Sequence, residues 1–235
     1  MHALIVAAGF GSRLRAVSPS KPLTPVAGTP LIARVIAAAR AGGATGFTVV
    51  TGHASDALQA YLRTLDPSIR CVDTPDWSLA NGHSVLTGAD AIGPAPHLLM
   101  MADHLFDPAI VAATIAAPRA PLTLAIDRRL DNPLVDLDDV TRVRTEAGRI
   151  VAIGKHLRDY DAFDCGVFAV EGRFHDALRR SIAAGGPGSI SAGVEALASE
   201  GEAKVVDIGA SWWLDVDDEK ALAQAEAALA PKRAA

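Results

Sequence analysis

A short apolar segment near the amino end of the chain runs into a loop of small residues that carries two cations. The loop reads Ala7-Ala8-Gly9-Phe10-Gly11-Ser12-Arg13, and Lys21 follows it. Gly9 and Gly11 allow the backbone to turn with positive φ and to bring its N–H groups close to a ligand. Successive N–H groups in such a turn form a concave anion site, and the two cations suit phosphate oxygens. The stretch predicts a phosphate-binding loop; the alternative is a simple glycine turn between a strand and a helix.

Two aspartates follow apolar segments and are candidates for holding a metal ion. Asp103 comes directly after the apolar run 97–102, and Asp215 closes a second apolar turn. In open α/β sheets, ligands bind at the carboxyl ends of the strands, where we also expect the glycine loop. Two carboxylates beside a phosphate site suggest Mg²⁺, completed by phosphate oxygens and water. The alternative is that such aspartates cap the next helix, the role we assign to Asp107 and Asp217.

Four further residues are candidates for contacts with a second substrate. Lys155 follows a predicted hairpin and a glycine, a position from which its ammonium group would reach an incoming phosphate; a solvated surface lysine is the alternative. Asp164 interrupts an apolar strand, which suggests hydrogen bonds to substrate hydroxyl groups or pairing with a neighbouring cation. Gly166 would leave room for that substrate. We expect His104 to contact substrate rather than metal, because Mg²⁺ prefers oxygen ligands.

The hydrophobic pattern predicts the strands and helices that must position these residues. Strand–helix–strand alternation implies parallel strands with right-handed crossovers. We therefore predict an α/β fold with a Rossmann-like mixed, mainly parallel sheet flanked by helices. It would form a single domain, residues 1–235, with a nucleotide-binding half (about 1–127) and an acceptor-binding half (about 128–235). The predicted strands are 3–7, 46–51, 69–72, 97–102, 122–127, a hairpin of 140–145 and 149–153, 163–170 and 204–208. The first predicted helix begins at Thr29-Pro30 with Thr29 as N-cap. The other predicted helices are 55–65, one that follows the loop 74–83 and ends near 91, a short one capped by Asp107, 174–184, 189–199 and one capped by Asp217.

Composition narrows the classes of function. The 235 residues are 50% hydrophobic but only 5% aromatic, which suits an aliphatic core of helices packed on a buried sheet. The formal charge of −5 argues against a broad nucleic-acid surface but allows a local anion pocket. Cys71 and Cys165 are the two cysteines, and we expect free thiols in a reducing cytoplasm. No apolar run approaches the roughly 20 residues of a membrane-spanning helix.

The motifs resemble those of the sugar-phosphate-type nucleotidyltransferases. Ala7–Arg13 matches the pattern Ala-Ala-Gly-x-Gly-x-Arg, and Ser20–Leu23 matches Pro-Lys-Pro-Leu with Ser for the first Pro. The match continues through residues 26–31, the strand end at Asp103 and the late Trp213-Leu214-Asp215 turn. The resemblance spans essentially the whole chain.

Within that superfamily, several segments are similar to CTP:inositol-1-phosphate cytidylyltransferases. They are residues 81–84, 102–106, 154–157 and 160–168. That family usually has Thr where Cys165 stands and Gly where Ala102 stands. In many relatives this domain is fused to a membrane-embedded CDP-alcohol phosphotransferase; here the chain stops after the closing helix, so we expect any such partner to be a separate protein.

The resemblance implies a role for each matching residue. Asp103 and Asp215 would hold Mg²⁺, and Arg13 and Lys21 would bind the triphosphate of CTP and neutralise the departing pyrophosphate. Lys155 would bind the acceptor phosphate. The other implied acceptor-binding residues are His104, Asp164 and Gly166, and the implied nucleotide-binding residues are Ala7, Ala8, Gly9, Phe10, Gly11, Ser12, Arg13, Lys21, Asn81, Ser84 and Asp103.

Several alternatives remain open from the residues alone. The first alternative keeps the same reaction but has another acceptor: phosphocholine, an aminoalkyl phosphonate or a sugar 1-phosphate. A choline head group would require an aromatic cage. A nucleotide-sensing regulatory domain without turnover is a second alternative, and a molybdenum-cofactor type of nucleotidyltransferase is a third. The oligomeric state is not predicted.

Overall fold

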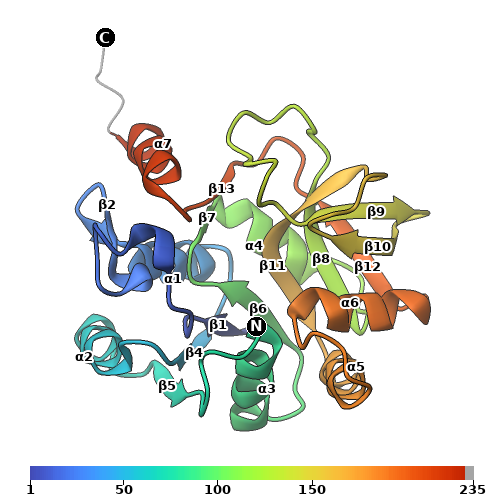
Figure 1. Cartoon of the computed structure of the whole chain (residues 1–235), viewed down its shortest axis with the longest axis horizontal. Helices are drawn as coiled ribbons and strands as arrows, with labels where there is room; N and C mark the ends of the chain where they lie inside the picture. Colours follow the sequence, from blue (N-terminus) through green and yellow to red (C-terminus); the bar gives the residue numbers. More distant parts are fainter. Residues whose placement is uncertain (231–235) are drawn as a thin grey trace.

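A nine-stranded sheet runs through residues 1–230, the part of the chain that the computed structural model describes (Figure 1). Seven strands run in one direction and only β10 and β11 run against them, which confirms the predicted mixed, mainly parallel α/β sheet. Residues 231–235, the end of the predicted domain, lie outside the described residues. The strands in spatial order are β5 (Arg70–Asp73), β4 (Gly46–Thr51), β1 (His2–Val6), β6 (His97–Met101), β11 (Ala162–Val170), β8 (Leu122–Asp127), β12 (Ala203–Asp207), β10 (Arg149–Gly154) and β9 (Arg142–Glu146).

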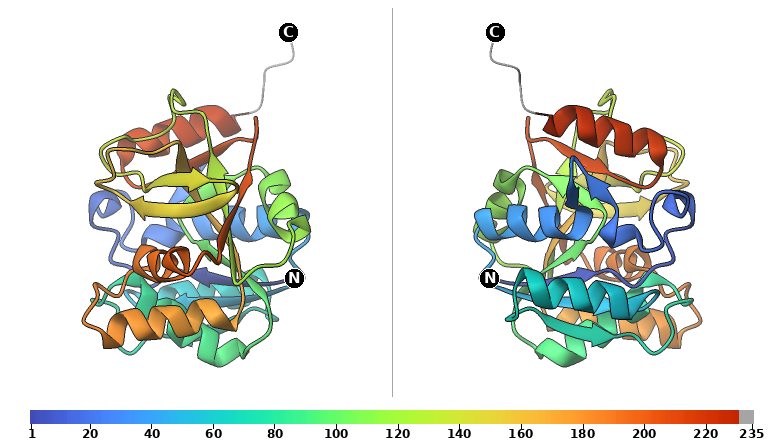
Figure 2. Two further views of the ribbon diagram at one scale, coloured as in Figure 1. Left: turned by 90° about the vertical axis from the view of Figure 1, so that its right-hand side faces the viewer. Right: turned by 90° about the vertical axis from the view of Figure 1, so that its left-hand side faces the viewer.

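Helices cover both faces of the sheet, and each face has its own apolar core (Figures 1 and 2). One core takes side chains from α1 (Leu31–Ala41), α2 (Ser55–Leu65), α4 (Pro108–Ala116) and α7 (Glu219–Leu229). The other takes them from α3 (Asn81–Ile92), α5 (Gly172–Ala183) and α6 (Ile190–Ser199). The helices form where apolar residues recur every three or four positions, because that spacing places them on one face.

Two short strand pairs lie outside the main sheet. β2 (Pro25–Val26) pairs with β3 (Thr29–Pro30), and β7 (His104–Phe106) pairs with β13 (Trp213–Asp215). The long connection from β8 to β9 lies at the same end of the molecule as β13 and α7 (Figure 1). These segments surround the edge where β1, β6 and β8 end.

The antiparallel direction of β11 brings its first residues to that same edge. Its register places Phe163 opposite Asp127, the last residue of β8. Asp164 and Gly166 therefore lie beside the carboxyl ends of β6 and β8, although they come from the start of a strand.

Two of the predicted helix caps are wrong. Thr29 is not an N-cap, because it pairs with Val26 in the β2–β3 turn and α1 begins at Leu31. Asp217 is not a cap either: α7 begins at Glu219, and the carboxylate of Asp218 accepts the hydrogen bond from the Ala221 amide. The predicted cap at Asp107 is confirmed.

Within residues 1–230, none of the helices has the length and apolar character needed to cross a lipid bilayer.

Candidate active site

The glycine loop presents free backbone amides next to a buried lysine. The buried residues Ala7 and Ala8 anchor its start through backbone hydrogen bonds with Val50 and His53. Gly11 has φ 60°, and a Cβ at that position would lie 2.4 Å from the Cβ of Lys21, so the close approach of loop and lysine requires glycine. Among the described residues, the amides from Gly9 to Ser12 donate no hydrogen bond. They are therefore available to an anion.

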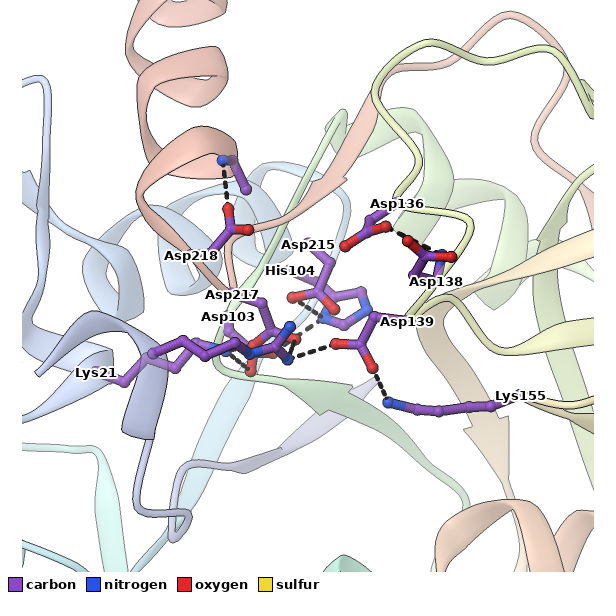
Figure 3. A network of polar contacts seen from close by, with 12 residues as sticks. Lys21, Asp103, His104, Asp136, Asp138, Asp139, Lys155, Asp215, Asp217 and Asp218 are labelled. Atoms are coloured by element: carbon purple, nitrogen blue, oxygen red, sulfur yellow. Dashed lines mark hydrogen bonds and ion pairs between the residues drawn. The ribbon is translucent and has the colours of Figure 1, made fainter.

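Lys21 and Arg13 are held by carboxylates from distant parts of the chain. Figure 3 shows Lys21 beside Asp103 and Asp217. Lys21 Nζ donates to Asp103 Oδ2 over 2.6 Å and also to Asp217. Arg13 Nη2 donates to Asp217 Oδ2 over 2.6 Å and also to Asp139. Burial alone would lower the pKa of Lys21, but Asp103, Asp215 and Asp217 outweigh it and raise that pKa above its ordinary value. The lysine is therefore a fixed positive charge between the loop and the strand ends.

The side chain of His104 lies between two carboxylates, those of Asp103 and Asp215. The β7–β13 register pairs His104 with Asp215, next to Asp103. His104 Nδ1 donates to Asp103 Oδ1 over 2.9 Å and lies 3.7 Å from Asp215 Oδ1. Burial would lower the pKa of His104, but Asp215 and Asp103 raise it to about 9. The imidazole is then protonated near neutral pH, and its ring stacks on Trp213 with centroids 6.1 Å apart.

Asp215 keeps one buried carboxylate oxygen, Oδ1, without a hydrogen-bond partner. Burial, together with the neighbouring carboxylates Asp103 and Asp217, raises the pKa of Asp215 to about 7. One ligand atom from each of Asp103, His104 and Asp215 lies within 4.8 Å of the others. Because hard divalent cations prefer carboxylate oxygens, Asp103 and Asp215 fit the predicted Mg²⁺.

Lys155 faces this cluster across a carboxylate that sequence reasoning missed. Its Nζ donates to Asp139 Oδ1 (Figure 3), and Asp139 Oδ2 accepts from Arg13. Burial would raise the pKa of Asp139, but Lys155 and Arg13 hold it well below its usual range. The Asp139 carboxylate thus bridges Arg13 of the glycine loop and Lys155, which follows β10.

Asp164 and Gly166 lie next to His104. The Gly166 amide donates to Asp164 Oδ1 over 2.7 Å, and burial raises the pKa of Asp164 to about 6. Gly166 has φ 72°, and a Cβ there would lie 2.5 Å from the imidazole Cδ2. The imidazole ring occupies the space that a side chain at position 166 would need, and Gly166 itself lines the second cavity, so its role beside a substrate stays a prediction.

Two cavities open at this edge of the sheet and meet at the charged cluster. The loop cavity, about 250 Å³, is lined by Val6, Ala7, Gly9, Gly11, Ser12, Arg13, Lys21, Pro22, Ala102, Asp103 and Asp217. The second cavity, about 260 Å³, has walls from β11, β13, α7, the β8–β9 connection and Lys155, which follows β10. Its lining includes His104, Asp139, Lys155, Asp164, Gly166, Trp213 and Asp215. Asp103 and Asp217 line both cavities.

Four predicted nucleotide-binding residues lie away from the loop cavity. Ala8 is a buried residue of the loop that does not line the cavity, and the Phe10 ring stacks on Trp77 with centroids 5.8 Å apart. Asn81 lines the second cavity instead, and its Oδ1 accepts from the Ile190 amide at the start of α6. Ser84 is buried in α3 and is absent from the lining of both cavities.

Comparison with known proteins gives this geometry a context. A family model described as a MobA-like NTP transferase domain matches residues 3–153. The chain belongs to that family. This nucleotidyltransferase is 36% identical over 220 residues to the bifunctional IPC transferase and DIPP synthase of Rubrobacter xylanophilus, covering 92% of this chain and 49% of that protein.

A second relative and a solved structure are also similar to this nucleotidyltransferase. The bifunctional IPC transferase and DIPP synthase of Archaeoglobus fulgidus is 29% identical over 176 residues, covering 73% of this chain and 33% of that protein. The chain therefore spans about half or less of the length of these relatives. The inositol-1-phosphate CTP transferase of T. maritima has the same fold, with a TM-score of 0.84, 22% identity and 96% of each chain covered.

Proposed function

We propose that this nucleotidyltransferase is a Mg²⁺-dependent cytidylyltransferase. It would condense CTP with a phosphorylated alcohol, most closely inositol 1-phosphate, to a CDP-alcohol and pyrophosphate. The observation that carries the proposal is that two cavities share the carboxylates Asp103 and Asp217, beside the buried Lys21. Two substrates in these cavities would place their phosphates next to each other. The names of the relatives support cytidine and inositol as the two organic groups.

CTP would occupy the loop cavity. The free amides of Gly9 to Ser12 and the cations of Arg13 and Lys21 would bind its phosphates, because anions suit such a concave site. Carboxylates pair with both cations in the structure, so phosphate oxygens would replace them on binding. Asp103 and Asp215 would hold Mg²⁺, which when bound neutralises charge on the transferred phosphate.

The acceptor would occupy the second cavity. Lys155 would bind its phosphate in place of Asp139, and Asp164 would accept hydrogen bonds from its hydroxyl groups. An acceptor phosphate oxygen attacks the α-phosphorus in line, the bond from that phosphorus to the bridging oxygen breaks, and pyrophosphate leaves. The attacking phosphate is already anionic near neutral pH, so no general base is needed. Catalysis then depends on positioning and on electrostatic stabilisation by Arg13 and Lys21.

The lining of the second cavity disfavours phosphocholine as acceptor. Its aromatic residues are Phe168 and Trp213, which are only 1% and 3% exposed. The face of Trp213 is also stacked on His104. Neither ring is available to form the aromatic cage that a choline head requires. Aspartates that accept hydrogen bonds suit a polyhydroxyl acceptor better.

The test is a measurement of pyrophosphate release with each nucleoside triphosphate and a panel of phosphomonoesters, with and without Mg²⁺. We expect release with CTP and inositol 1-phosphate only when Mg²⁺ is present. Release with another base or another acceptor would reassign the substrates. Tight CTP binding without any release would favour a regulatory domain. A CDP-alcohol product would be a substrate for a membrane CDP-alcohol phosphotransferase, which we propose as the functional partner.

A further inference from the structure

A fully buried carboxylate lies behind the second cavity, at the carboxyl end of β8. Asp127 is 0% exposed and accepts five hydrogen bonds. Arg129 donates three of them, from its amide, Nε and Nη2, over 2.8 to 2.9 Å. Asn132 Nδ2 and Trp213 Nε1 donate the other two to Oδ2, over 2.9 and 2.8 Å. Burying a carboxylate is costly unless donors satisfy both of its oxygens, as these five hydrogen bonds do.

One of these donors belongs to the wall that holds the predicted metal ligands. Trp213 is the first residue of β13, two residues before Asp215, and its ring stacks on His104. Arg129 strengthens the same wall, because its Nη2 also donates to the Ser211 carbonyl over 2.7 Å, just before β13. The Asp127 carboxylate therefore sets the position of β13 from behind.

The other donor belongs to the opposite wall. Asn132 lies in the first half of the β8–β9 connection, residues 128–141. Its Oδ1 and its carbonyl accept from the amides of Leu134 and Val135, which line the second cavity. The same connection carries Asp139, the bridge between Arg13 and Lys155. A single buried group thus joins both walls.

We propose that Asp127 is a positioning residue that fixes the second cavity by holding Trp213 on one wall and Asn132 on the other. It does not touch the cavity and acts through these two side chains. Its expected effect on catalysis rests on the proposed transferase function, whereas its effect on the two walls does not.

An amide cannot replace this carboxylate. Every neighbour of Asp127 is a donor, and both of its oxygens accept. In Asp127→Asn the new NH₂ group would face an N–H donor in either orientation, because asparagine has a single acceptor oxygen. At least one of Arg129, Asn132 and Trp213 would lose its partner while the size of the side chain is kept.

The experiment compares Asp127→Asn with the matched control Asp161→Asn. Asp161 also accepts from several donors, including the amide and hydroxyl of Thr145, but lines neither cavity. Hydrogen exchange would be followed by mass spectrometry in residues 131–140, 211–216 and 5–20. We expect Asp127→Asn to speed exchange about tenfold or more in the first two segments and to leave the glycine loop unchanged, with no such pattern in the control.

Kinetics separate positioning from general stability. We expect Asp127→Asn to raise the acceptor KM and the Mg²⁺ concentration for half-maximal rate by about 10-fold to 100-fold, the usual effect of removing a group that orients ligands. CTP affinity measured without metal should change less than about twofold. Trp213→Phe removes the indole donor, so combining it with Asp127→Asn should give less than the sum of the single effects.

Two results would overturn the positioning role, and a third would support it. Exchange and kinetics like those of the control, or faster exchange spread evenly over the chain, would overturn it. Faster exchange in the two walls of an enzyme that transfers nothing would refute the proposed function and support the positioning role.

Discussion

The neighbouring residues Asp217 and Asp218 differ completely in what they contact. Asp218 caps α7, whereas Asp217 pairs with Lys21 and Arg13 at the far end of the sequence. Both residues precede a helix and both are acidic, so local pattern assigns a cap to either one. Only the fold shows which of them points into the site.

Removing the charge at Asp217 should impair turnover without unfolding the protein. We expect Asp217→Asn to lower kcat/KM about tenfold or more, because hydrogen bonds between charged groups that orient Arg13 and Lys21 are weakened. Steady-state kinetics and a thermal melt would measure this. The control is Asp90→Asn, which weakens an exposed ion pair to Arg179. Equal kcat/KM in the two variants would contradict a role for Asp217 in the site.

Asp215 should show opposite effects on stability and on activity. Its pKa of about 7 means that the folded protein binds a proton that the unfolded chain releases near pH 4. The ionised carboxyl therefore costs stability, and this cost grows as the pH rises from about 4 to 7. We expect Asp215→Asn to raise Tm, more at pH 8 than at pH 5, while the Mg²⁺-dependent rate falls on the order of 10²-fold. A lower Tm at pH 8 with an unchanged rate would refute both assignments.

At the scale of secondary structure, hydrophobic periodicity predicted most elements within one or two residues. The strand at 46–51 and the helix at 55–65 have the bounds expected from the sequence. The spacing of apolar residues within each segment shows which face is buried and so whether the segment is a strand or a helix. The caps at Thr29 and Asp217 were wrong because a one-residue shift in a helix start changes the cap and leaves the periodicity unaltered.

The elements that complete the site were harder to predict. β7 and β13 are three residues long, too short for a period, and their pairing depends on contacts between segments about a hundred residues apart. The β8–β9 connection has no regular structure, so Asp139 stood among other acidic residues without a distinguishing signal. The glycine loop and Asp103, in contrast, directly follow apolar strands, so their place at the edge of the sheet could be predicted from the sequence.

The contact between β6 and α5 should make stability depend on pH. His97 and His175 stack with ring centroids 5.0 Å apart, and they are 1% and 4% exposed. Burial lowers the pKa of both, that of His175 to about 4. Since the unfolded chain takes up these protons near pH 6.5, their contribution is fully present above that pH and is lost as the pH falls toward 4. We expect His175 alone to cost about 2 kcal/mol of unfolding free energy at pH 5 relative to pH 7.

The measurement is urea unfolding at both pH values for the wild type and His175→Phe. The variant keeps an aromatic ring and cannot take up a proton, so its loss between pH 7 and pH 5 should be smaller by about that amount. His156→Phe, at an exposed position, serves as the control. An identical pH dependence in all three proteins would show that the stacked pair does not titrate on unfolding.

For the whole molecule, the arrangement of the sheet explains why two cavities share one charged cluster. β1 and β6 bring the glycine loop and Asp103 to one edge, and the antiparallel β11 brings Asp164 to the same edge from the second half of the chain. The predicted division into a nucleotide half and an acceptor half remains a proposal, which substrate-specific variants can test.

Lys155 offers such a test, because it lines the second cavity and not the loop cavity. We expect Lys155→Gln to raise the acceptor KM about 10-fold to 100-fold, the value of a lost charged hydrogen bond to phosphate, and to leave the CTP KM within about twofold. Initial rates with each substrate varied in turn would measure both constants. A larger change for CTP than for the acceptor would reverse the assignment of the two cavities.

In the proposed reaction, an acceptor phosphate attacks the α-phosphorus of CTP where the two cavities meet. The most direct measurement follows the label from CTP carrying ³²P at the α-phosphate, mixed with Mg²⁺ and inositol 1-phosphate. We predict that the label enters an organic diphosphate at a rate that depends on both substrates, that unlabelled pyrophosphate is released in equal amount, and that Asp103→Ala slows this on the order of 10²-fold or more with its fold intact. Label recovered as CMP or CDP, or a rate independent of the acceptor, would contradict this reaction.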